Sequence, residues 1–97
     1  MAQLASKADG AGHTSSVVPS DTTDLTFGAV GDDDCHTAVL EWTPDGGTTW
    51  IRVTGSLIDL SRRSSGSASI ALHDGVEVRA DIRGGGADVW LEGSNFS

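Results

Sequence analysis

The sequence has little of what stabilises small domains other than a packed core. Its 97 residues contain one cysteine, Cys35, so no disulfide can form within the chain. Cys35 could form a disulfide only with a cysteine of another chain. No apolar run has the length of a secretory signal or approaches the ~20 residues of a membrane-spanning helix. We therefore expect a protein made in a cytosol and stabilised by packing or by partners.

Positive charge and aromatic residues are also scarce. Six basic residues stand against 14 acidic ones, giving a net charge of −8. Binding to phosphates would work against this field, so we expect neither nucleic acid nor a membrane as partner. With 37% hydrophobic and 5% aromatic residues, the chain has enough apolar surface for one modest core.

What the sequence does contain is a series of short β-type runs separated by turn residues. The clearest is the run 76–83, where Val78, Ala80 and Ile82 alternate with charged residues, as in an antiparallel strand with one buried face. The pattern predicts an all-β fold, a small antiparallel β-sandwich or barrel of about seven strands with an extended N-terminal arm. The strands are expected at residues 25–30, 37–42, 48–53, 57–60, 68–72, 76–83 and 87–92.

Two turn signals frame the strand at 76–83. His73, Asp74 and Gly75 precede it, and an Asp-Gly pair before a strand predicts a hairpin with the strand at 68–72. The glycine run 84–86 follows it and turns the chain into the last strand.

The N-terminal segment differs in composition from the rest. Residues 1–22 are rich in Ala, Ser, Thr and Gly, without helical or strand periodicity, so we expect an extended arm there and a β-sandwich body over 23–97. The arm is either a floppy terminus or a segment that becomes ordered on a partner. The candidate partner-binding residues are Leu4, Lys7, His13, Val17 and Val18 in the arm, with Arg62, Arg63 and Trp90 on the body.

The most specific local motif runs from Thr43 to Trp50, Thr-Pro-Asp-Gly-Gly-Thr-Thr-Trp. It resembles the Asp-box, a hairpin in which an aspartate accepts hydrogen bonds from the loop and a tryptophan packs under the turn. In sialidase-like propellers the box recurs in each blade, away from the catalytic centre, so a single copy does not imply glycosidase activity. The hairpin residues are Thr43, Asp45, Gly46, Gly47, Thr49 and Trp50.

Candidate metal and catalytic residues are few. Asp32, Asp33 and Asp34 form either a solvated turn or a calcium loop, although they lack the staggered ligands of an EF-hand. His13, His36 and His73 are scattered without zinc-site spacing, and no serine lies in a nucleophile elbow. The sequence predicts no enzyme, cofactor or metal centre.

Three tryptophans supply most of the aromatic surface. Trp42 falls on the apolar face of its predicted strand, whereas Trp50 and Trp90 fall opposite the apolar sets. They are expected in the core or in a subunit interface, with a carbohydrate- or host-surface-binding platform as the alternative.

Several segments together resemble a group of small structural proteins of tailed bacteriophage virions. These are residues 5–10, the strand 39–42, the turn 44–50 and the alternation 76–80. The resemblance implies a non-enzymatic virion protein, such as a capsid decoration or cement protein, a head-fibre base, or a head–tail connector or tail accessory protein. It implies a phage capsid or connector protein as partner. For the decoration role we expect a homo-oligomer, with a trimer favoured.

Overall fold

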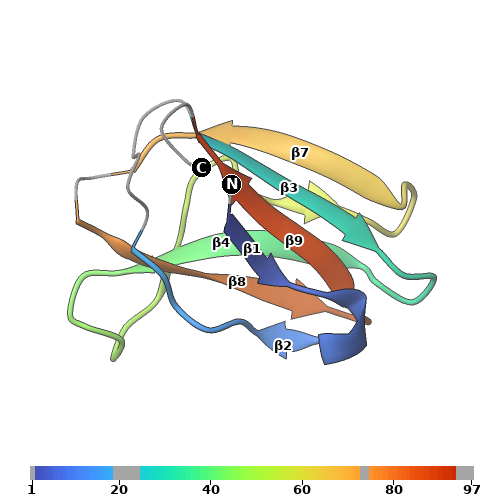
Figure 1. Ribbon diagram of the computed structural model, residues 1–97, viewed down its shortest axis with the longest axis horizontal. Helices are drawn as coiled ribbons and strands as arrows, with labels where there is room; N and C mark the ends of the chain where they lie inside the picture. Colours follow the sequence, from blue (N-terminus) through green and yellow to red (C-terminus); the bar gives the residue numbers. More distant parts are fainter. Residues whose placement is uncertain (1, 19–24, 73–74, 94–97) are drawn as a thin grey trace.

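The computed structural model, which describes residues 2–18, 25–72 and 75–93, is a β-sandwich of two antiparallel sheets (Figure 1). The first sheet has the order β1 (Ala2–Ala5), β9 (Ala87–Glu92), β3 (Leu25–Gly31), β7 (Ser65–Ile70). The second has the order β2 (Gly12–His13), β8 (Glu77–Arg83), β4 (Thr37–Thr43), β5 (Ile51–Arg52), and β6 (Ile58–Asp59) also pairs with β4. The predicted all-β sandwich is confirmed. Within the described residues the structure has nine strands rather than about seven.

The core lies between the two sheets and follows the alternation read from the sequence. In β8, Val78, Ala80 and Ile82 are buried against the facing sheet. Phe27 of β3, Leu40 of β4 and Leu91 of β9 are fully buried. Where alternation was clear, the observed strands β3, β4, β8 and β9 match the predicted ranges to within one residue at each end.

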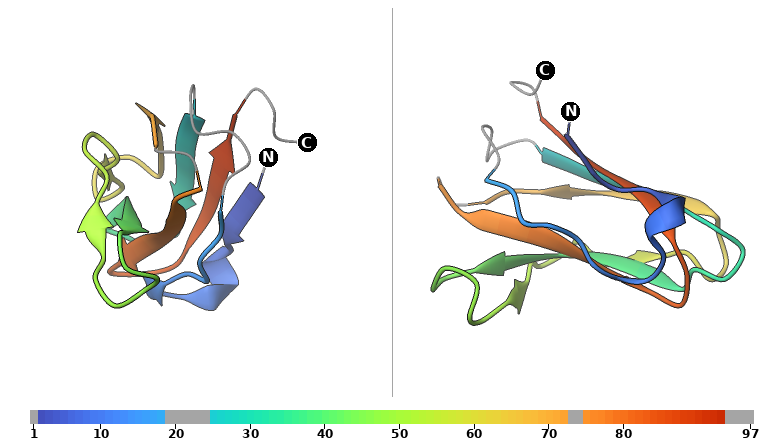
Figure 2. Two further views of the ribbon diagram at one scale, coloured as in Figure 1. Left: turned by 90° about the vertical axis from the view of Figure 1, so that its left-hand side faces the viewer. Right: turned by 60° about the horizontal axis from the view of Figure 1, so that its bottom comes forward.

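The N-terminal segment is extended, but residues 2–18 do not form a separate arm. β1 pairs with β9, and Figure 2 shows the blue N-terminal strand beside the red one. β2 pairs with β8, and Val17 forms a further bridge to Val78. Without this segment β9 and β8 would be sheet edges with unpaired backbone groups, which explains why it lies along them. A short 3-10 turn, η1 (Lys7–Asp9), carries the chain from one sheet to the other. The predicted residues 19–22 of the arm lie outside the described residues.

The connections on either side of β8 are not hairpins. β7 belongs to the first sheet and β8 to the second, so the hairpin predicted from Asp74 and Gly75 is wrong, although His73 and Asp74 themselves lie outside the described residues. The glycine run 84–86 likewise crosses from β8 to β9 in the other sheet. Ile70 and Val78 enter the same core from opposite sheets, which requires a crossing rather than a hairpin.

The edge of the second sheet is one strand interrupted in the middle. β5 and β6 pair with the same strand, β4, and are separated by residues 53–57. The fully buried Ser56 fills this gap: its Oγ accepts a hydrogen bond from the Leu40 amide at 3.1 Å and donates to the Val53 carbonyl at 2.7 Å. The structure therefore replaces a missing strand contact with a side chain. No helix in the described part of the chain has the length and apolarity needed to cross a membrane.

Candidate interaction surfaces

The Asp-box-like loop is held together by Asp45. Its Oδ1 accepts hydrogen bonds from the amides of Thr49 at 2.8 Å and Thr48 at 3.1 Å, and from the Thr43 hydroxyl at 3.0 Å. The Thr43 hydroxyl oxygen in turn accepts from the Gly47 amide at 2.8 Å. The Thr49 amide, foremost among these donors, holds the pKa of the Asp45 carboxyl below its ordinary value. The loop is thus built from contacts within eight residues.

The same contacts shorten the strand that follows. The sequence predicts a strand over 48–53, but the Thr48 and Thr49 amides serve Asp45, so β5 is reduced to Ile51 and Arg52. Ile51, in this shortened strand, is exposed. Gly46 and Gly47 adopt positive φ angles of 76° and 112°, which accounts for both glycines of the motif.

Trp50 closes the loop and joins it to the outer face of the second sheet. Its indole N–H donates to the Gly47 carbonyl at 3.1 Å. The Arg79 guanidinium carbon lies 4.1 Å from the centre of the ring, in cation–π geometry. Because Arg79 covers a face on which a sugar would stack, this arrangement favours a structural role for Trp50.

Charged side chains from three neighbouring strands meet beside Trp50. Arg79 donates to Glu41 at 3.0 Å, and Arg83 donates to Asp81, also at 3.0 Å. His13 of β2 lies against both carboxylates, with Nε2 3.5 Å from Asp81 and 3.9 Å from Glu41. Asp81, expected on a fully solvated face, is buried because these partners surround it.

The acidic turn at 32–34 is organised mainly by Asp32. One of its carboxylate oxygens accepts from the Asp34 amide at 3.0 Å, and the other from the Gly86 amide at 2.9 Å. A Cβ on Gly86 would overlap the Lys7 carbonyl, so this glycine is required where the three segments meet. Both Asp32 oxygens serve the backbone, which supports a structural turn rather than a calcium loop.

Cys35, next to this turn, is buried in the core and is 3% exposed. Burial, together with the charge of Asp32, raises the pKa of its thiol. The native thiol is therefore not placed to form a disulfide with another chain.

The side of the sandwich opposite the N-terminal segment is less completely covered. We call it the β5–β7 side and define it by residues 51–54, 57–59, 62–67 and 71–72. It holds two open hollows of about 360 and 500 Å³. The first is lined by Trp42 and residues 51–54 and 71–72, and the second by residues 57–59, 62–63 and 65–67. At the second hollow β6 packs closely on β7, where a Cβ on Gly66 would come within 2.7 Å of Ile58.

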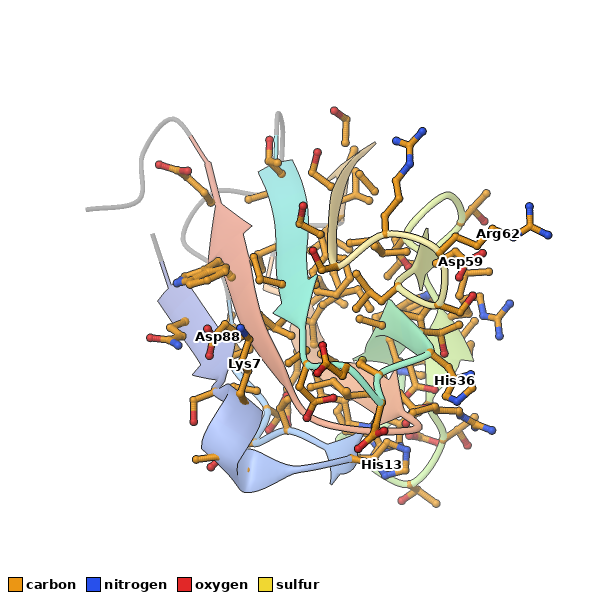
Figure 3. All side chains as sticks on the ribbon, turned by 90° about the vertical axis from the view of Figure 1, so that its right-hand side faces the viewer. Lys7, His13, His36, Asp59, Arg62 and Asp88 are labelled. Carbon is orange, nitrogen blue, oxygen red and sulfur yellow. The ribbon has the colours of Figure 1, made fainter. Side chains whose placement is uncertain are left out.

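This side combines exposed apolar residues with positive charge. Ile51 is 41% exposed and Leu57 51% exposed. Three of the six basic residues of the chain line the two hollows, Arg52, Arg62 and Arg63, and among the described lining residues the one acid is Asp59. Figure 3 shows Arg62 extending away from the molecule near Asp59. The chain as a whole has a net charge of −8, whereas the described residues that line these hollows include more basic than acidic side chains.

The predicted partner-binding residues are dispersed by the fold. Leu4 and Val17 pack against the core, while Val18 is 58% exposed. The Lys7 amide donates to Asp88 at 2.9 Å, and Figure 3 shows the two residues side by side. Trp90 is half-buried on β9, opposite Gln3 of β1. Of the predicted set, only Arg62 and Arg63 lie together on the β5–β7 side.

Two groups of residues escaped the sequence reasoning. Ser56 looks like a loop serine, and nothing local shows that it is buried. His13, Glu41 and Asp81 are far apart in the sequence and meet only because β2, β8 and β4 are neighbours.

No protein-family model, curated protein or solved structure matches the chain.

Proposed function

We propose that this protein is a non-enzymatic structural protein of a bacteriophage virion, of the capsid decoration type, and that its β5–β7 side binds an acidic surface of a capsid subunit. The resemblance of its strand and turn segments to small virion proteins supports the class. The observation that carries the mode of binding is the β5–β7 side, where exposed Ile51 and Leu57 adjoin three arginines.

The physical case for this side rests on two complementary effects. Burying Leu57 and Ile51 in a contact removes apolar area from water, at roughly 25 cal/mol for each Å². Arg62 and Arg63 add attraction to acidic groups and oppose docking on basic ones. Many weak contacts of this kind on one lattice add up through multivalency. We propose a trimer as the assembled form. Light scattering on the free protein gives its molar mass, and so the number of chains in each particle.

The copy number in the virion tests the function. Virions of the phage that encodes the chain are purified and the protein is quantified against the major capsid protein. A number that scales with the capsid lattice supports decoration. A number set by the symmetry of the portal or tail would instead assign it to the connector or tail, and its absence from virions would overturn the proposal.

Charge-matched variants test the binding side. Arg62→Gln with Arg63→Gln and, as control, Ser15→Glu with Ser16→Glu lower the net charge equally, but on different sides of the molecule. We expect the arginine variant to lose occupancy on the capsid and the serine variant to keep it. Equal losses would show that only the overall charge matters, and no loss in either would refute the charge contribution of this side.

An apolar pair separates the β5–β7 side from the N-terminal segment. Leu57 and Val18 are similarly exposed, and each can be changed to serine. The β5–β7 side predicts that Leu57→Ser lowers occupancy and Val18→Ser does not. The reverse pattern would return the binding role to the N-terminal segment.

A further inference from the structure

The outer face of the second sheet brings together three side chains with metal-binding atoms. His13, Glu41 and Asp81 each offer one ligand atom, and these atoms lie within 4.8 Å of one another. They come from β2, β8 and β4, which are neighbours in that order in the second sheet (Figure 1). His13 is directly opposite Asp81 in the β2–β8 pairing, and Glu41 is opposite Arg79, two residues before Asp81. The backbone register thus fixes all three side chains on one face.

We propose that His13, Glu41 and Asp81 bind a divalent transition-metal ion of the zinc class. One imidazole nitrogen with two carboxylate oxygens is a ligand set that such ions accept, with a fourth position left for water. Metal–ligand bonds of about 2.0–2.1 Å place tetrahedral ligands about 3.3 Å apart. His13 Nε2 is 3.5 Å from Asp81 and 3.9 Å from Glu41, and all three ligand atoms lie within 4.8 Å of one another, so each pair would have to close by at most about 1.5 Å around a shared ion.

The contacts around each of the three residues determine how its ligand atom can reach an ion. His13 has a half-exposed side chain and lies on a strand of only two residues, so it can adjust to an incoming ion. Asp81 directs Oδ1 toward His13, while its other oxygen, Oδ2, accepts a hydrogen bond from Arg83. Oδ1 is therefore the oxygen that can bind an ion. Glu41 shares Oε1 between Arg79 and His13, so it binds the ion by releasing that oxygen from Arg79 or by presenting Oε2.

The two arginines also set the strength of the site. Their positive charges offset those of the carboxylates, so binding is expected to be weaker than in structural zinc sites, which use several thiolates or imidazoles. Hydrogen bonds from arginine orient the carboxylates, as outer-shell partners do in metal sites. A bound ion would join the N-terminal segment to β8 and β4 and so stabilise that part of the sandwich.

Titration of the full-length protein with Co²⁺, followed by visible absorption and by calorimetry, tests the site, and Zn²⁺ is then added as competitor. We expect one saturable equivalent of Co²⁺, displaced by Zn²⁺, and a rise in melting temperature with Zn²⁺. His13→Ala and Glu41→Gln are each expected to weaken binding by about tenfold or more. His36→Ala, which removes an exposed histidine outside the cluster, should bind as the wild type does.

The same data can overturn the proposal. Absence of saturable binding, or unchanged affinity in His13→Ala, would show that the three residues form only an ion-pair cluster. Loss of binding in His36→Ala alone would place the ion elsewhere. Circular dichroism of each variant shows that it is folded, and Glu41→Gln provides the second ligand test because Glu41 is less buried than Asp81.

Discussion

Replacing Ser56 by alanine removes the side chain that connects the two halves of the interrupted edge strand. Its hydroxyl oxygen accepts from the Leu40 amide and its proton is shared between the carbonyls of Val53 at 2.7 Å and Leu40 at 3.2 Å. Both Ser56 and Leu40 are 0% exposed. In Ser56→Ala the Leu40 amide therefore loses this hydrogen-bond partner at a position that is buried from solvent.

The size of the effect follows from that unpaired amide. A buried donor left without a partner costs about 1–3 kcal/mol. A domain of this length has a free energy of unfolding of about 5–15 kcal/mol, so the loss is a considerable part of the total. Each kcal/mol corresponds to about 4–8 °C in melting temperature for a domain of 60–100 residues. Residues 53–56 lead directly into Leu57, so the capsid contact proposed for that residue should also weaken in this variant.

Urea unfolding followed by tryptophan fluorescence measures the change. Ser67→Ala makes the same chemical change at an exposed position of β7 and should stay within about 0.5 kcal/mol of the wild type. If Ser56→Ala also loses less than about 0.5 kcal/mol, the hydroxyl is not what satisfies Leu40, and our account of the interrupted strand is wrong.

Three further predictions concern the loops and the core. The Asp45 pKa is lowered in the folded protein, so this carboxylate stabilises the fold above its ordinary pKa and the contribution disappears as the pH falls through the folded value; Asp45→Asn should remove that part of the acid sensitivity in urea titrations. Cys35 should react with a thiol reagent only as fast as the protein unfolds, and immediate labelling of the native protein would contradict its burial. Gly86→Ala should push away the Lys7 backbone and make the N-terminal segment sensitive to protease, whereas Gly28→Ala, with its nearest neighbour at 3.9 Å, should not.

The features that the sequence predicts correctly are those whose cause is local. The alternation in β8 reflects one buried face, and the same rule applies whatever strand lies beside it. The loop around Asp45 is equally local, because its hydrogen bonds join residues at most four apart. Such features need no knowledge of the rest of the fold.

The features that it misses depend on distant partners. β1 and β2 have no periodicity and form because β9 and β8 offer free edges. β7 begins at Ser65, three residues before the predicted strand at 68–72, because β3 pairs with it along its whole length. His13 meets Asp81 only through the order of strands in the second sheet. In each case tertiary pairing overrides weak local preference.

The position of the N-terminal segment changes how the capsid-binding hypothesis has to be tested. For a free arm, deleting residues 1–21 would leave a folded body that no longer binds. In this structure the deletion removes β1 and β2, exposes the edges of β9 and β8, and takes Ala5 out of the core. We therefore expect the truncated protein to be markedly destabilised, as thermal unfolding would show, and its failure to bind would not identify the binding surface. The paired variants Leu57→Ser and Val18→Ser avoid this ambiguity, because both residues are exposed and neither is in the buried core.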